Sequence, residues 1–279
     1  MTAEERKQHN NDISNEIIPH LLENGIEIRL CELSIQDLIV IQKNARYALE
    51  TKMFHMDDEQ SFRFNQMIEQ IYFMIIDKGK TADKLYLFID KKTKMPYIDR
   101  DFRIFLFSEK EFAEDALDYF MQQLRFWEIK EISKEDIVKT LGQSFYMNGA
   151  SGVLIDNGQT YIAFKAEEIL EAPDFSNTHP MDIPITNPNY LAALTSLVQE
   201  QNWNANYPEK GRYLRYYEEQ MIIEFCNAKF LIPVKGMPKF GSDHEITLHE
   251  GAKISIPSLS NGENNATPVF TDWNQFNKV

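Results

Sequence analysis

One short pattern occurs twice in this chain of 279 residues, and it limits the possible folds more than any other feature. At Arg103–Phe107 the apolar run RIFLF precedes SEKEF, and at Thr267–Phe270 the run TPVF precedes TDWNQF. Around both runs the pattern predicts the same order: helix, helix, strand, loop, strand and capped helix. Because such a repeated order is typical of duplicated units, it predicts an α+β fold of two similar domains, each with helices packed on a small mixed or antiparallel sheet.

A proline-rich segment divides the two predicted domains. Four of the eleven prolines lie between Pro173 and Pro188, and proline neither continues a helix nor donates to a β ladder. We therefore expect a linker at 173–187. The predicted divisions are an N-terminal helix and strand at 1–33, a first domain at 34–172 and a second at 188–279.

Local signals within the first domain are specific. Strands are predicted at Lys84–Asp90 and Arg103–Phe107, where β-forming residues are dense. Ser108 and Glu111 have the spacing of a capping box, which predicts that Ser108 caps the following helix. The pair Asn157-Gly158 lies between two β-rich runs, which predicts a hairpin with a two-residue type I′ turn.

The second copy of the pattern is shorter than the first. After its helix, which is expected to begin with Thr271 as cap, the sequence lacks a counterpart of the Asn157-Gly158 hairpin. A sheet that ends there would have an open edge, and an unpaired edge strand can pair with a strand of another chain. The pattern thus predicts a protein partner or a homo-oligomer.

These same motifs resemble the SseB family of bacterial serine-sensitivity proteins. The resemblance rests on LIPV at Leu231–Val234, on ISIPSL at Ile254–Leu259 and on PVFTD at Pro268–Asp272. The first domain matches the family pattern more loosely, through LYLFID and IFLFSEKEF. The resemblance implies an α+β fold and a bacterial, cytoplasmic protein, and it carries no catalytic residues over to this chain.

Composition excludes several classes of protein. The net charge of −14 disfavours binding to nucleic acid, and the apolar runs are too short to cross a membrane. The polar N-terminus does not resemble a signal peptide, so a cytoplasmic location is expected. Cys31 and Cys226 both lie in apolar surroundings with acidic neighbours, and we expect them to be buried free thiols.

No sequence motif predicts a cofactor or a metal. In DHEITLHEG, His244 and His249 are five residues apart, whereas a zincin motif places its histidines four apart on one helix face. Asp99 and Asp101 flank Arg100 and are expected at the tip of a hairpin rather than around a cation. We therefore predict neither a metal site, nor a bound cofactor, nor a set of catalytic residues.

Three residues are candidates for an interaction surface. Arg212 and Arg215 alternate with tyrosines in KGRYLRYY, on a predicted helix. Trp273 occupies a helix position where the first copy has the polar Lys110. The resulting hypothesis is a non-catalytic protein-interaction or scaffold module. The alternative is a small-ligand-binding protein or an enzyme whose site is assembled from distant residues.

Overall fold

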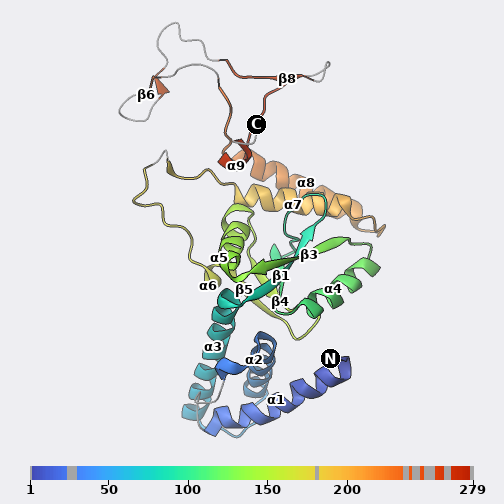
Figure 1. Ribbon diagram of the computed structural model, residues 1–279, viewed down its shortest axis with the longest axis vertical. Helices are drawn as coiled ribbons and strands as arrows, with labels where there is room; N and C mark the ends of the chain where they lie inside the picture. The colour runs from blue at the N-terminus through green and yellow to red at the C-terminus, as the bar shows by residue number, and fades with distance from the viewer. Residues whose placement is uncertain are drawn as a thin grey trace.

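A computed structural model describes residues 2–23, 30–179, 182–234, 239–240, 246–247, 255–260 and 265–276. It shows an α+β fold, as predicted, built around a five-stranded mixed sheet (Figure 1). The helices before the linker are α1 (Ala3–Glu23), α2 (Ile35–Glu50), α3 (Asp58–Thr81), α4 (Lys110–Gln122), α5 (Lys134–Gly142) and α6 (Ala166–Ile169). The strands of the sheet are β1 (Lys84–Asp90), β2 (Arg103–Phe107), β3 (Trp127–Ser133), β4 (Gly152–Ile155) and β5 (Ile162–Lys165).

The strand order is β3-β1-β2-β4-β5. The pair β2 and β4 is parallel, whereas the other neighbours are antiparallel. The carboxyl ends of two adjacent strands therefore lie side by side at the centre of the sheet. The predicted strands at 84–90 and 103–107 are confirmed, with Leu87 opposite Leu106.

The two faces of the sheet are chemically different because side chains alternate along each strand. One face is aliphatic: Leu85, Leu87 and Ile89 of β1 belong to the core cluster that also includes Ile68, Ile71 and Ile75 of α3. The other face is aromatic and packs against α4. Its buried rings, the aromatic cluster, are Phe88, Tyr97, Phe105, Phe107, Phe112 and Trp127. Both faces are thus covered, and the sheet is the interior of the molecule.

Helix ends follow the sequence signals at some places and not at others. Ser34 caps α2 in a full capping box with Asp37, and Asp57 caps α3 in the same way with Gln60. Gly79 does not end α3: it is buried inside the helix, which continues to Thr81. The predicted strand at 26–33 lies partly outside the described residues, and its described part, Leu30–Glu32, is the 3₁₀ helix η2. After α5 the chain continues directly into the π-helical turn η3 (Gln143–Met147), so Gly142 does not end the helix.

The hairpin of β4 and β5 is confirmed, but its predicted two-residue turn is wrong. Ile155 pairs with Ile162, so six residues connect the strands. The left-handed residues are Asp156 (φ 58°) and Gly158 (φ 103°). The Gln159 N–H donates to the Asp156 carbonyl, and a positive φ at the third position of such a turn is typical of type II. Asp156 is buried and its N–H donates to the Leu106 carbonyl oxygen at 2.9 Å, so the chain still follows β2 there and the turn begins later.

Two long helices follow the linker. These are α7 (Pro188–Asn202), which begins at a proline, and α8 (Lys210–Asn227). They pack on each other, and α7 contacts η3. Gly149 has φ +78°, and a Cβ there would lie 2.0 Å from the Pro188 carbonyl oxygen. A glycine is required at this position because the start of α7 approaches the backbone so closely.

The remaining described elements are short. They are β6 (Lys239–Phe240), β7 (Ile246–Thr247), β8 (Leu259–Ser260), β9 (Asn265–Ala266) and α9 (Trp273–Phe276). Leu231 forms a single antiparallel bridge with Phe270. The described residues of this segment contain no counterpart of the five-stranded sheet, so the structure does not show the predicted duplication. The predicted cap of α9 is also wrong: Asp272 Oδ1, not Thr271, accepts the Gln275 N–H at 2.9 Å.

Candidate functional site

Helix α8 has an uncovered outer face. Every residue of α8 is described by the structure, and among these 18 residues Tyr217 alone is buried. The exposed residues recur every three or four positions, which places them on one side of a helix. This set, the α8 stripe, consists of Arg212, Arg215, Tyr216, Glu219, Ile222, Ile223 and Cys226. Ile222 and Ile223 are 52% and 51% exposed, in a helix long enough to bury a full face.

The charges of the α8 stripe are unevenly distributed. Arg212 and Arg215 lie in its N-terminal half, and Glu219 follows at its centre. Within the described residues neither Arg215 nor Glu219 has an ion-pair partner. The stripe therefore combines apolar side chains with unpaired charges of both signs, which is a composition suited to contact with another protein.

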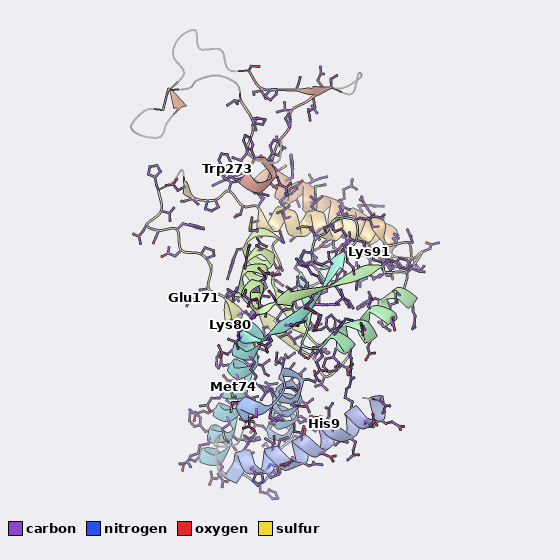
Figure 2. The ribbon with its side chains drawn as sticks, in the orientation of Figure 1. His9, Met74, Lys80, Lys91, Glu171 and Trp273 are labelled. Carbon is purple, nitrogen blue, oxygen red and sulfur yellow. The ribbon has the colours of Figure 1, made fainter. Side chains whose placement is uncertain are left out.

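The structure does not bring the three predicted interaction residues together. Arg212 and Arg215 are both exposed on α8, as a surface role requires. Trp273 is 46% exposed on α9 (Figure 2). The centroid of its ring lies 5.4 Å from that of the Phe276 ring, and the angle between the two ring planes is 76°. Because α8 rises by about 1.5 Å per residue, its two ends are separated by roughly 25 Å. Trp273 lies by the C-terminal end of α8, whereas Arg212 and Arg215 lie towards its N-terminal end.

Asn187 explains why Trp273 lies at that end. Its Nδ2 donates to the carbonyl oxygens of Lys229 at 2.7 Å and Thr271 at 2.9 Å, and its Oδ1 accepts the Lys229 N–H at 2.8 Å. One buried side chain thus joins the end of the linker, the residues after α8 and the residues before α9. The segment around Trp273 is fixed to the base of α8 by these three hydrogen bonds.

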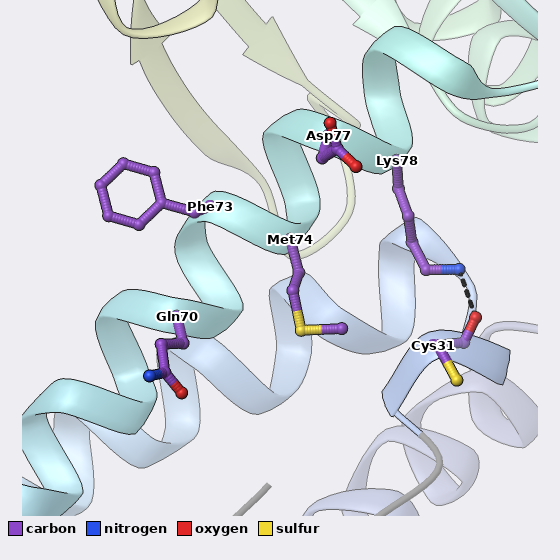
Figure 3. A pocket seen from close by; sticks show the side chains of 6 residues that line it. All are labelled: Cys31, Gln70, Phe73, Met74, Asp77 and Lys78. Atoms are coloured by element: carbon purple, nitrogen blue, oxygen red, sulfur yellow. Dashed lines mark hydrogen bonds between the residues drawn. The ribbon is translucent and has the colours of Figure 1, made fainter.

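The cysteines are exposed, which corrects the prediction that they are buried. Cys226 belongs to the α8 stripe, and Cys31 lies in η2 beside a groove of about 610 Å³ along α3 (Figure 3). In this groove Lys78 Nζ donates to the Cys31 carbonyl oxygen at 2.8 Å. In η2 the buried residue is Leu30, and beside Cys226 even Phe225 is 45% exposed, so apolar sequence neighbours did not report burial. No histidine is among the described residues that line the groove, so none of them is the imidazole base that activates a catalytic thiol.

Asp156 is the one strongly perturbed acid at the sheet. It follows β4 and is 0% exposed. Ser108, which follows β2, donates its N–H to Asp156 Oδ1 and its hydroxyl to Asp156 Oδ2, both at 2.7 Å. Burial raises the pKa of the Asp156 carboxyl to about 7, although the bonds from Ser108 lower it. Ser108 therefore joins two parallel strands and does not cap α4; Glu109 is the N-cap, without a side-chain hydrogen bond. Because Asp156 is fully enclosed, it has a structural role.

Acidic clusters do not form a metal site in the described part of the chain, where no group of three or more metal-binding side chains occurs. Asp99 and Asp101 are at a hairpin tip, as predicted, and both bind Arg103, at 2.8 Å and 2.6 Å. The histidines of DHEITLHEG lie outside the described residues. No described helix is long and apolar enough to cross a membrane.

A second site joins the two parts of the chain. The loop between α4 and β3 contacts the end of α7, where Trp203 Nε1 donates to the Gln123 carbonyl oxygen at 2.7 Å. Arg125 lies over the Trp203 ring, with its Cζ 3.8 Å from the ring centroid. A cavity of about 200 Å³ opens beside this pair.

No family model, curated protein or solved structure matches this chain. The resemblance to the SseB family therefore remains an expectation from the motifs.

Sequence reasoning named Arg212 and Arg215 but missed the rest of the α8 stripe and the stacking of Arg125 on Trp203. The α8 stripe could have been found, since Arg212, Arg215, Glu219, Ile222 and Cys226 have the alternating three- and four-residue spacing of a helix–helix contact. The stacking of Arg125 on Trp203 could not have been found, because 78 residues separate the two and neither belongs to a recognisable motif.

Proposed function

We propose that this protein is a non-catalytic protein-interaction module, a cytoplasmic α+β protein of SseB type in which the family pattern occurs twice. Its contact surface is the α8 stripe. The observation that carries this proposal is that an 18-residue helix buries one residue and exposes a stripe in which Ile222 and Ile223 lie beside charged side chains of both signs. Burial of apolar area is the main driving force of association, so such a face favours a protein partner.

We further propose that the stripe pairs with a second copy of itself. We consider two α8 helices that run antiparallel, with the twofold axis crossing them at the height of Tyr217. Arg215 of each chain then faces Glu219 of the other, so the dimer contains two identical ion pairs. The same arrangement places the aliphatic stem of Arg212 against Ile222 of the second copy. Parallel pairing would instead place equal charges opposite each other, which is unfavourable.

Charge reversal tests this arrangement. Arg215→Glu and Glu219→Arg each replace two attractive contacts per dimer by two repulsive ones, so we expect either variant to weaken the dimer by about tenfold or more. The double variant restores the pairs with their signs exchanged and should recover most of the affinity. Sedimentation equilibrium at low salt measures the dimer dissociation constants of the original protein, the two single variants and the double variant.

The matched control is Lys7→Glu, an equal charge change on α1, which lies at the opposite end of the molecule from α8 (Figure 1). This variant should dimerise as the original protein does. A chain that stays monomeric throughout the micromolar range would contradict the self-pairing, as would equal affinities of the single and double variants. A monomer that binds another protein through α8 would contradict the self-pairing and leave the interaction module standing.

A further inference from the structure

Three segments far apart in sequence form a basic cavity at the junction of the sheet with α7. Its volume is about 200 Å³. The first segment is the turn after β1, the second is the connection from α4 to β3, and the third is the end of α7. The side chains that line the cavity include those of Lys91, Lys92, Leu124, Arg125, Phe126 and Asn202.

The cavity gathers positive charge in a chain whose net charge is −14. It contains three cationic side chains, those of Lys91, Lys92 and Arg125, and one carboxylate, that of Asp90. Asp90 Oδ1 is already occupied, since it accepts the N–H groups of Lys92 at 3.0 Å and Thr93 at 2.7 Å. The local excess of cations therefore favours an anion in the cavity.

Arg125 is held in an orientation suited to an anion. Stacking on Trp203 fixes the guanidinium plane, and the indole is itself held by its hydrogen bond to Gln123. Among the described residues Arg125 has one hydrogen bond, a long one of 3.5 Å to the Tyr97 hydroxyl, and no carboxylate partner. Because a guanidinium has five N–H donors, most of its donors remain available for a planar oxyanion.

The apolar wall restricts the ligand further. Leu124 and Phe126 line the cavity and are 47% and 52% exposed, so apolar surface borders the charged groups. Lys92 Nζ donates to Asn202 Oδ1 at 3.0 Å, which connects the turn after β1 to α7. The volume is below the range of about 300–1,000 Å³ that is typical of drug-sized ligands.

From these observations we infer that the cavity between the sheet and α7 binds a small organic carboxylate. Arg125 binds the carboxylate through its free N–H groups, Lys91 and Lys92 add charge, and Leu124 and Phe126 contact the apolar part of the ligand. Lys91 lies at the end of β1, beneath the α7–α8 pair (Figure 2). A ligand there contacts both the sheet and α7, so its binding stabilises their junction.

Titration with sodium benzoate at constant ionic strength tests the inference. Calorimetry gives the dissociation constant, and tryptophan fluorescence reports changes around Trp127 and Trp203, which both line the cavity. We expect benzoate to bind and to change the emission, and the neutral analogue benzyl alcohol to bind at least tenfold more weakly. No measurable benzoate binding, or equal binding of benzyl alcohol, would overturn the inference.

Variants locate the site. Arg125→Gln and Lys91→Gln should each weaken benzoate binding, by about tenfold or more and about threefold respectively, because each removes a cation next to the carboxylate. Lys91 has no described hydrogen bond or ion pair, so its variant tests the site even if Arg125→Gln disturbs the stack. The control Lys139→Gln, an exposed residue of α5, should bind as the original does. Unchanged binding by Lys91→Gln and Arg125→Gln would place benzoate elsewhere and refute the assignment.

Discussion

Helices α3 and α8 are similar in length but differ in how they are packed. α3 has 24 residues and buries Phe64, Ile68, Ile71 and Ile75 against α2 and the sheet. α8 has 18 residues and buries Tyr217. The chain covers the apolar side of α3 with α2 and the sheet. It also packs α8 on α7, but it leaves the opposite face of α8, which includes Ile222 and Ile223, exposed. The comparison teaches that α3 belongs to the folding core, whereas the outer face of α8 is available to a second molecule.

The largest expected effect is in the core. Phe88 lies at the centre of the aromatic cluster, with ring centroids 4.7 Å from Phe107 and 5.3 Å from Trp127. Phe88→Ala leaves a cavity there and should lower the free energy of unfolding by about 3–5 kcal/mol. Ile223→Ala on the α8 stripe should change it by less than about 0.5 kcal/mol at concentrations where the protein is monomeric. Urea denaturation of both variants measures the difference, and equal losses would break the contrast between core and surface.

A smaller effect is expected where the two regions join. Gly149→Ala puts a Cβ 2.0 Å from the Pro188 carbonyl oxygen and forces alanine into a left-handed conformation. It should cost at least about 2 kcal/mol by displacing the start of α7. The control is Gly211→Ala in α8, where a Cβ would meet nothing within 4 Å, and its stability should be unchanged or slightly raised. Thermal unfolding compares the two; a neutral Gly149→Ala would mean that α7 is not fixed to the sheet at this point.

Measured per pH unit, the smallest effect concerns the ionisation of Asp156. The folded-state pKa of Asp156, about 7, lies above its ordinary value of 3.8, so between these values the folded chain binds more protons than the unfolded chain. The stabilisation is complete below about pH 3.8 and is lost as the pH rises through about 7, with a slope of at most about 1.4 kcal/mol per pH unit. Asp156→Asn can keep both contacts with Ser108 and should make the unfolding free energy flatter across this window. Denaturation at several pH values measures both slopes, and parallel slopes would show that Asp156 is ionised when folded.

Sequence predicted the sheet better than the surfaces, for physical reasons. The runs at Lys84–Asp90 and Arg103–Phe107 form strands because β-forming residues and alternation act locally. The capping role of Ser108 failed since a residue 48 positions away, Asp156, takes its hydroxyl and its N–H. The N–H of Asp156 bonds to Leu106, so the turn at Asn157-Gly158 begins later than local turn preferences indicate.

The exposure of Cys226 and the cavity beside Arg125 were equally beyond local reasoning. Both depend on where α7 and α8 lie, and that placement is decided by contacts such as Trp203 with Gln123 and Gly149 with Pro188. The spacing of the α8 stripe was readable in the sequence. What the sequence could not show was which side of α8 the rest of the chain would cover.

The native cysteines provide the most direct test of the central claim, that the outer face of α8 is covered by a second copy. Both thiols are free and exposed in the single chain, but Cys226 belongs to the α8 stripe and Cys31 does not. Alkylation rates of the two, measured by mass spectrometry from nanomolar to high micromolar protein, need no substitution. The account predicts that Cys226 becomes several-fold slower to react as the concentration rises while Cys31 keeps its rate. Constant rates for both thiols over the whole range would contradict it.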